Sequence, residues 1–124
     1  MERRSFREGE TIFREGDISD RAFQVISGSV NVHLPGGRLR NLGAGEIFGE
    51  MGLLDNRPRS ATVIAGEDGE LTAFTESELV RAIRTDPDAA INFIRALLHR
   101  LREANDARRG GSSFLGFTLE NFGG

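Results

Sequence analysis

The sequence contains no cysteine, tryptophan, tyrosine or lysine, and these absences narrow the chemistry open to it. Without cysteine there is no disulfide, no thiolate-ligated zinc site and no thiol nucleophile. All 16 basic side chains are arginine, which we attribute to genomic composition bias rather than to a binding function. No apolar run reaches the roughly 20 residues that a membrane-spanning helix needs.

The length and overall composition are those of one folded domain. The chain has 124 residues, of which 38% are hydrophobic and 28% are charged, a balance typical of a globular rather than a disordered protein. The net charge of −3 gives no overall attraction to nucleic acid or to an anionic membrane. Residues 1–5 lack the apolar core of a signal peptide, so we expect a cytoplasmic protein that binds neither nucleic acid nor membrane.

Short strand-like segments separated by glycine turns occupy the chain up to Phe74. Residues 29–34 alternate strictly between apolar and polar side chains, and the Pro-Gly-Gly sequence after them predicts a turn. The tetrapeptide Phe-Arg-Glu-Gly occurs at 6–9 and again at 13–16. We interpret each copy as a glycine-closed turn with its phenylalanine packed beneath. Many short strands at this spacing predict an all-β barrel, sandwich or jelly roll.

Two further glycine-containing breaks divide the extended stretches. Ser27-Gly28 predicts the end of one strand and the start of another, and the turn sequence at 66–69 separates a strand at 60–65 from one at 71–74. We therefore expect four short strands in these two regions.

The sequence pattern becomes helical after these strands. A capping box that begins at Thr75 opens a helix over residues 76–85. An Asp-Pro pair at 86–87 then starts a second helix, whose apolar residues recur three and four positions apart to about residue 108. The predicted fold is thus mainly β with two C-terminal helices.

Residues 110–124 differ from the domain that we assign to residues 1–109. Gly110-Gly111-Ser112-Ser113 predicts a flexible joint, and the segment after it is apolar. Three interpretations of this tail stay open: it docks back on the domain, it binds a partner, or it is a frayed terminus.

The most informative stretch runs from Phe48 to Val63. A short helix that begins near Gly49 would present free N–H groups suited to an anion, and Arg59 could close on that anion with a forked contact. Glu50 would be repelled by the anion unless it accepts a hydrogen bond from the same ligand. A phosphate with a neighbouring hydroxyl, as in a sugar phosphate or nucleotide, satisfies both residues. Alternatively, Arg59 and Glu50 form a structural ion pair in a domain without a ligand.

This stretch and the order of elements around it resemble the cyclic nucleotide-binding domain. That family includes regulatory subunits of cyclic-AMP-dependent kinase, catabolite-activator-type regulators and nucleotide-gated channels. The likeness covers roughly residues 5–108 and is strongest over 45–54 and 58–63, which are similar to the family's phosphate-binding cassette. It implies an eight-stranded β-barrel or jelly roll followed by two α-helices.

The resemblance also implies a role for individual residues. Arg59 matches the arginine that pairs with the cyclic phosphate, and Glu50 matches the glutamate that accepts from the ribose 2′-hydroxyl. The other implied ligand-binding positions contact the phosphate, the sugar or the base, and they are Gly49, Met51, Ser60, Ala61, Val32 and Phe48.

No activated nucleophile, general base or metal cluster accompanies these residues, so we expect a sensor rather than a nucleotide hydrolase or transferase, with no metal and no cofactor. Serine at position 60 resembles the residue of bacterial cyclic-AMP receivers, so the resemblance implies cyclic AMP as the ligand, with cyclic GMP as the alternative. The resemblance implies that Leu53 and Leu54 press on the first C-terminal helix, and that the ligand moves the two helices through these side chains. The signal then passes to a protein partner, or to a second copy along the 87–108 helix. The alternative function is a ligand-free protein-interaction scaffold of the same fold.

Overall fold

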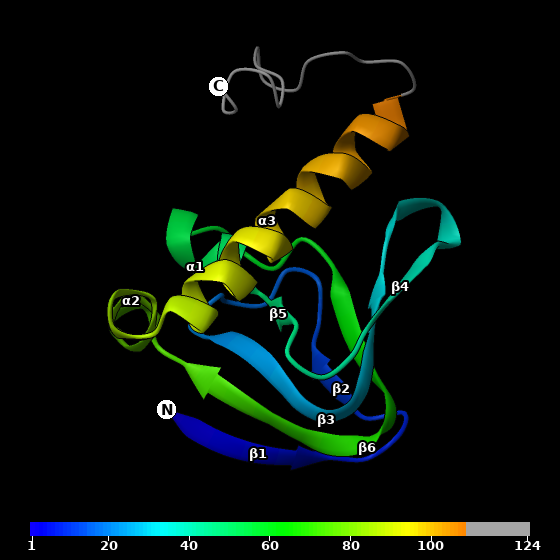
Figure 1. Ribbon diagram of the computed structural model, residues 1–124. Helices are drawn as coiled ribbons and strands as arrows, with labels where there is room; N and C mark the ends of the chain where they lie inside the picture. The colour runs from blue at the N-terminus through cyan, green and yellow to red at the C-terminus, as the bar shows by residue number, and fades with distance from the viewer. Residues whose placement is uncertain (109–124) are drawn as a thin grey trace.

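A computed structural model describes residues 1–108, except for the side chains of Arg100 and of residues 103–108. Six strands form one antiparallel sheet in the order β1–β6–β3–β4, with β2 also paired to β6 and β5 also paired to β3 (Figure 1). The strands are β1 (Glu2–Phe6), β2 (Thr11–Phe13), β3 (Ala22–His33), β4 (Leu39–Leu42), β5 (Ile47–Phe48) and β6 (Thr62–Phe74). The predicted joint and apolar tail at 110–124 lie outside the described residues.

The long strands β3 and β6 pair with each other along most of their length and bend together. Their register shifts near Ser27 and Gly28. Gly28 has a φ of 75°, and a Cβ atom built on it would collide with the carbonyl oxygen of Asp68. A Cβ atom on Gly69 would lie 2.9 Å from the Cα atom of Gly28. The two backbones can therefore approach closely only because both positions are glycine.

This bend leaves the predicted fold class unchanged, and it makes the strand count depend on how the bent strands are counted. The sequence breaks at 27–28 and 66–69 are bends within single strands, because β3 and β6 continue through them. The mainly β fold with C-terminal helices is confirmed. Within residues 1–108 the structure has six strands, or eight when the two halves of each bent strand are counted separately, and the sheet does not close into a barrel.

The main apolar core lies on one side of this curved sheet. Val30, Val32 and Leu34 all pack in it, which confirms the predicted alternation of residues 29–34. The other members also come from alternating strand positions, and the buried ones are Phe6, Phe23, Val25, Leu42, Phe48, Val63, Ala65, Leu71 and Ala73.

Three α-helices and one 3-10 turn complete the described part of the chain: α1 (Glu50–Asp55), α2 (Glu76–Thr85), α3 (Pro87–Arg108) and the turn at Pro35–Gly37. The predicted capping box is confirmed, because the Thr75 hydroxyl accepts from the Glu78 N–H and the Glu78 carboxylate accepts from the Thr75 N–H. In Figure 1, α3 runs past the sheet and extends beyond it. None of these helices is long and apolar enough to cross a membrane.

Each copy of the Phe-Arg-Glu-Gly sequence forms a turn that makes two backbone hydrogen bonds to one residue elsewhere in the chain. In the first turn, residues 6–10, the Gly9 N–H donates to the Ala65 carbonyl over 2.9 Å. The Ala65 N–H donates to the Glu10 carbonyl over 2.8 Å. Within the turn, the Glu10 carboxylate accepts from the Arg7 N–H over 3.1 Å. Gly9 has a φ of 86°, so glycine closes this turn as predicted.

The second turn, residues 13–17, repeats these contacts around a different residue. The Gly16 N–H donates to the Arg59 carbonyl, and the Arg59 N–H donates to the Asp17 carbonyl, both over 2.8 Å. The Asp17 carboxylate accepts from the Arg14 N–H over 2.9 Å, and Gly16 has a φ of 92°. The second turn therefore fixes the main chain of Arg59.

Candidate ligand-binding site

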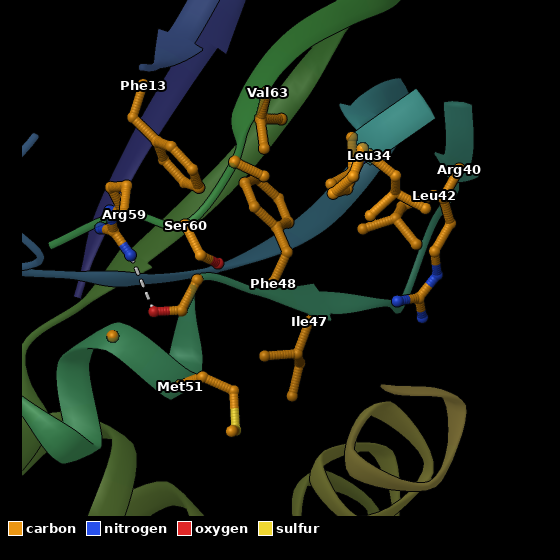
Figure 2. Close-up of a pocket in the computed structure, with 15 residues that line it drawn as sticks. Phe13, Leu34, Arg40, Leu42, Ile47, Phe48, Met51, Arg59, Ser60 and Val63 are labelled. Carbon is orange, nitrogen blue, oxygen red and sulfur yellow. Dashed lines mark hydrogen bonds between the residues drawn. The ribbon is translucent and has the colours of Figure 1, made fainter. Parts of the chain in front are cut away.

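A cavity of about 230 Å³ lies where β3, β4, β5, α1 and the segment leading into β6 meet (Figure 2). The predicted ligand-binding residues that line it are Val32, Phe48, Gly49, Met51, Arg59, Ser60 and Ala61. Residues from β3, from the β5–α1 segment and from the approach to β6 thus come together at a single cavity. Glu50 is the one predicted residue that is not in its wall.

Glu50 is fully buried at the first position of α1, with an exposed fraction of 0%. Gly49 precedes it as the N-cap, in the left-handed region with a φ of 78°. A Cβ atom on Gly49 would lie 2.8 Å from Nη1 of Arg59. Glycine at position 49 therefore leaves room for the Arg59 side chain, whereas contacts of Gly49 and Glu50 with a ligand stay predictions.

Arg59 is the buried cation of the site, with 5% of its surface exposed. Its Nη1 atom donates to the Gly49 carbonyl over 2.8 Å, drawn as the dashed line in Figure 2. Its Nη2 atom donates to the Arg21 carbonyl over 2.6 Å. Its guanidinium carbon lies 4.2 Å from the centre of the Phe13 ring. Main-chain carbonyls and an aromatic face thus hold the side chain.

The electrostatic surroundings leave the charge of Arg59 only partly compensated. Burial lowers the pKa of the Arg59 guanidinium, and the carboxylates of Asp20, Asp17 and Glu50 raise that pKa in part. The Nε atom is buried without a hydrogen-bond partner among residues 1–108. A buried donor of this kind on a cation favours an anion in the adjoining cavity.

The cavity wall is joined to the C-terminal helices by two apolar clusters. Leu53 of α1 packs with Leu79 of α2, in a cluster with Ala22 and Phe74. The prediction that Leu53 presses on the first C-terminal helix is therefore confirmed. Leu54 is 43% exposed and is not part of this cluster. The same prediction for Leu54 stays a prediction.

The second cluster joins β5 to α3. Phe48 lines the cavity, and its neighbour Ile47 packs against Phe93 and Ala96 of α3. A crevice of about 170 Å³ between α3 and the β4–β5 connection shares Ile47 and Arg40 with the cavity wall. The two-residue strand β5 thus contacts both the cavity and α3.

Comparison with known proteins identifies the domain. Residues 3–86 match the family model described as the cyclic nucleotide-binding domain. The chain belongs to this family. A cyclic AMP receptor protein of Thermus thermophilus is 43% identical over 111 residues, which are 85% of this chain and 51% of that protein.

Solved structures agree with the assignment of a cyclic nucleotide-binding domain. The crystal structure of the Thermus thermophilus catabolite activator protein has a TM-score of 0.66 and 42% identity, over 83% of this chain and 51% of that one. The EAL enzyme Bd1971 in its cAMP-bound form has a TM-score of 0.60 and 37% identity, over 85% of this chain and 30% of that one. Its cGMP-bound form has a TM-score of 0.61 and 35% identity, over 86% and 30%. The chain spans about half the length of the Thermus relatives, at 51%.

The cyclic nucleotide-binding domain has wall residues that sequence reasoning missed. The sequence indicates only a turn position for Phe13 and no site role for Arg40, although both line the cavity. A signal for Arg40 was present, because the turn at 35–37 makes a hairpin in which Arg40 stands opposite Val32. Figure 2 shows Arg40 and Arg59 on opposite sides of the cavity. Within residues 1–108 there is no cluster of side chains that could hold a metal ion.

Proposed function

We propose that this domain binds a cyclic nucleotide in the cavity beside Arg59 and acts as a regulatory module without catalytic activity. The observation that carries the proposal is the buried guanidinium of Arg59 at the cavity wall, whose Nε atom has no hydrogen-bond partner in the described part of the chain. A cyclic phosphate would pair with this charge and accept from this donor. Membership of the family supports the same ligand class.

The proposed contacts follow from the position of each residue. Each Nη atom of Arg59 donates one N–H to a carbonyl, so a two-point contact with the phosphate uses the Nε N–H and the second N–H of one Nη atom. The ribose 2′-hydroxyl donates to Glu50. The remaining contacts come from the N–H groups of Gly49 and Met51, from Ser60 and Ala61 at the phosphate, and from Val32 and Phe48 at the base.

Titration calorimetry with cyclic AMP tests the proposal against the ligand-free scaffold. We expect saturable heat with one site per chain. Absence of heat with both cyclic AMP and cyclic GMP would leave the scaffold as the better account. A phosphorus NMR spectrum of the nucleotide after long incubation tests the lack of catalysis, and we expect the nucleotide to be recovered unchanged.

Cyclic AMP is our proposed preference over cyclic GMP. Ser60 directly follows Arg59, and the Thermus relative is named a cyclic AMP receptor protein. One observation favours cyclic GMP instead. Arg40 lies across the cavity from Arg59, and a guanidinium matches the O6 and N7 acceptors of guanine. The Bd1971 enzyme has both a cAMP-bound and a cGMP-bound form.

The two nucleotides are separated by calorimetry on the native protein and on Arg40→Gln. We expect tighter binding of cyclic AMP, and an Arg40→Gln variant that binds cyclic AMP as the native protein does. If Arg40 reads guanine, the native protein prefers cyclic GMP and the variant loses that preference. The second result would overturn the proposed order of affinities.

We further propose that the ligand acts by changing the position of α2 and α3. Leu53 links α1 to α2, and Ile47 links β5 to α3, so both helices contact elements of the cavity wall. The ligand can shift the helices only to the extent that it binds one arrangement more tightly. We expect amide hydrogen exchange in α3 to change when cyclic AMP is added. An identical exchange pattern with and without bound ligand would contradict this mechanism.

The recipient of the signal is proposed to be a protein partner or a second copy of the chain that contacts α3. The exposed apolar side chains Ile91, Ile94 and Leu97 lie on this helix and offer a surface for that contact. Sedimentation equilibrium with and without cyclic AMP distinguishes self-association from a separate partner. With a net charge of −3, we expect no binding to a DNA duplex in fluorescence anisotropy at physiological salt.

A further inference from the structure

We propose that the second turn is a positioning element for Arg59, and that the ring of Phe13 is the platform on which its guanidinium rests. The inference rests on the proposed function, because it assigns a role in ligand binding to residues outside the cassette. It concerns the side chain of Phe13 and the main chain of residues 14–17. Neither was expected from the sequence to bear on the ligand.

The first observation is the stacking of Arg59 on an aromatic face. Its guanidinium carbon lies 4.2 Å from the centre of the Phe13 ring and 5.5 Å from that of Phe23. The negative face of a ring attracts a cation, and this attraction is largest where water is excluded. Arg59 is buried, so the contact offsets part of the cost of removing its charge from water.

An aromatic platform suits an anion-binding arginine better than a carboxylate would. A carboxylate in the same place would accept hydrogen bonds from the guanidinium and would repel the phosphate. The ring of Phe13 stabilises the cation without occupying any N–H group, and it carries no net charge. The Nε atom, which has no partner within residues 1–108, therefore stays able to donate to a ligand.

The second observation explains why Phe13 reaches Arg59. Strand β2 pairs with β6 at Thr11–Ile64 and at Phe13–Val63, so two steps along β2 correspond to one step along β6. This register shift has the geometry of a β-bulge, which turns a side chain away from its regular direction. Phe13 then stands in the cavity wall.

The third observation is that two backbone hydrogen bonds fix the main chain of Arg59. Strand β6 begins at Thr62, so Arg59 lies before the strand and outside its ladder of hydrogen bonds. The second turn supplies the missing pair of bonds through Gly16 and Asp17, both of 2.8 Å. The backbone of Arg59 is thus fixed by the turn, and its side chain is fixed by the ring that precedes the turn.

Affinity measurements on matched variants test the proposal. We expect Phe13→Leu to weaken cyclic AMP binding by about tenfold, the size of a desolvated cation–π contact. Phe13→Tyr keeps the ring and should bind within about threefold of the native protein. Phe6→Leu changes the equivalent phenylalanine of the first turn, and should lower thermal stability without changing the affinity.

A double-mutant cycle separates a positioning role from direct contact of Phe13 with the ligand. In an Arg59→Lys background the planar guanidinium is absent, so the loss caused by Phe13→Leu should shrink to less than about threefold. An undiminished tenfold loss in that background, or native affinity of Phe13→Leu alone, would overturn the proposal.

A spectroscopic measurement without ligand keeps this test apart from the proposed function. The Nε–Hε NMR resonance of Arg59 should carry a ring-current shift in the unliganded protein. Phe13→Leu should remove the shift and Phe6→Leu should keep it. If the native protein binds no cyclic nucleotide, the proposed function fails, while this resonance still reports whether Phe13 holds Arg59. A resonance unchanged by Phe13→Leu refutes the platform.

Discussion

The first turn forms two backbone hydrogen bonds with Ala65 and the second turn forms two with Arg59, although both turns are built from the same four amino acids. In each turn, the glycine N–H donates to the carbonyl of the bound residue, Ala65 or Arg59. The carbonyl of the residue after the glycine accepts from the N–H of that same bound residue. Ala65 is a core residue with 2% of its surface exposed, whereas Arg59 lines the cavity. The local structure is the same, so the difference in role comes from the residue that each turn holds.

The two phenylalanines show the same divergence. Phe6 is 3% exposed and belongs to the apolar core. Phe13 is half-buried, and its ring contacts the guanidinium of Arg59. A repeated sequence therefore predicts a repeated turn, but not the same contribution to stability or binding.

Substituting the residues that the turns bind, Ala65 and Arg59, should give the largest contrast between the two turns. Arg59→Lys keeps the charge but loses the planar fork, so we expect cyclic AMP affinity to fall by about 1.5–3 kcal/mol. Ala65→Gly should leave the affinity unchanged and lower the free energy of unfolding by about 1 kcal/mol. Calorimetry and urea unfolding measure the two effects. Native affinity of Arg59→Lys would contradict the assignment of the cassette.

The turn glycines provide an intermediate contrast. Gly9 and Gly16 both have positive φ, and apart from the adjoining residues no atom lies within 4 Å of the place that a Cβ atom would take on either one. Alanine should therefore cost about 1–2 kcal/mol of unfolding free energy at either site through backbone strain alone. Only Gly16→Ala should also weaken cyclic AMP binding in calorimetry, by about threefold, because it loosens the hold on Arg59. Equal binding losses in both variants would remove the distinction.

The side-chain acceptors inside the turns should give the smallest contrast. Glu10 accepts from the Arg7 N–H and Asp17 accepts from the Arg14 N–H. Loss of either acceptor should cost about 0.5–1.5 kcal/mol locally. We expect Glu10→Ala to speed hydrogen exchange at the Ala65 N–H, and Asp17→Ala to speed it at the Arg59 N–H. Exchange that rises at both amides in both variants would mean that the turns do not act separately.

The elements that the sequence predicted well are those set by neighbouring residues. The capping box at Thr75, the proline start of α3 and the two glycine turns each depend on a few consecutive side chains. The cassette from Gly49 to Arg59 is also nearly continuous, so its residues were found together. Local chemistry was sufficient in these cases.

The features that the sequence did not predict depend on contacts between distant segments. The glycines of β3 and β6 indicate turns locally, but together they permit the backbones of two paired strands to approach closely where both strands bend. The place of Phe13 depends on a register shift against β6, which alternation within β2 does not reveal. The exposure of Leu54 depends on which side of α1 faces α2.

The close approach of β3 and β6 at Gly28 and Gly69 has a consequence for large-scale mutagenesis. Any side chain at either position meets the main chain of the opposite strand, although neither glycine lines the cavity. A deep mutational scan scored on nucleotide response would therefore mark both as intolerant. Such a map, taken by itself, would place part of a binding site where the molecule has only two backbones in contact.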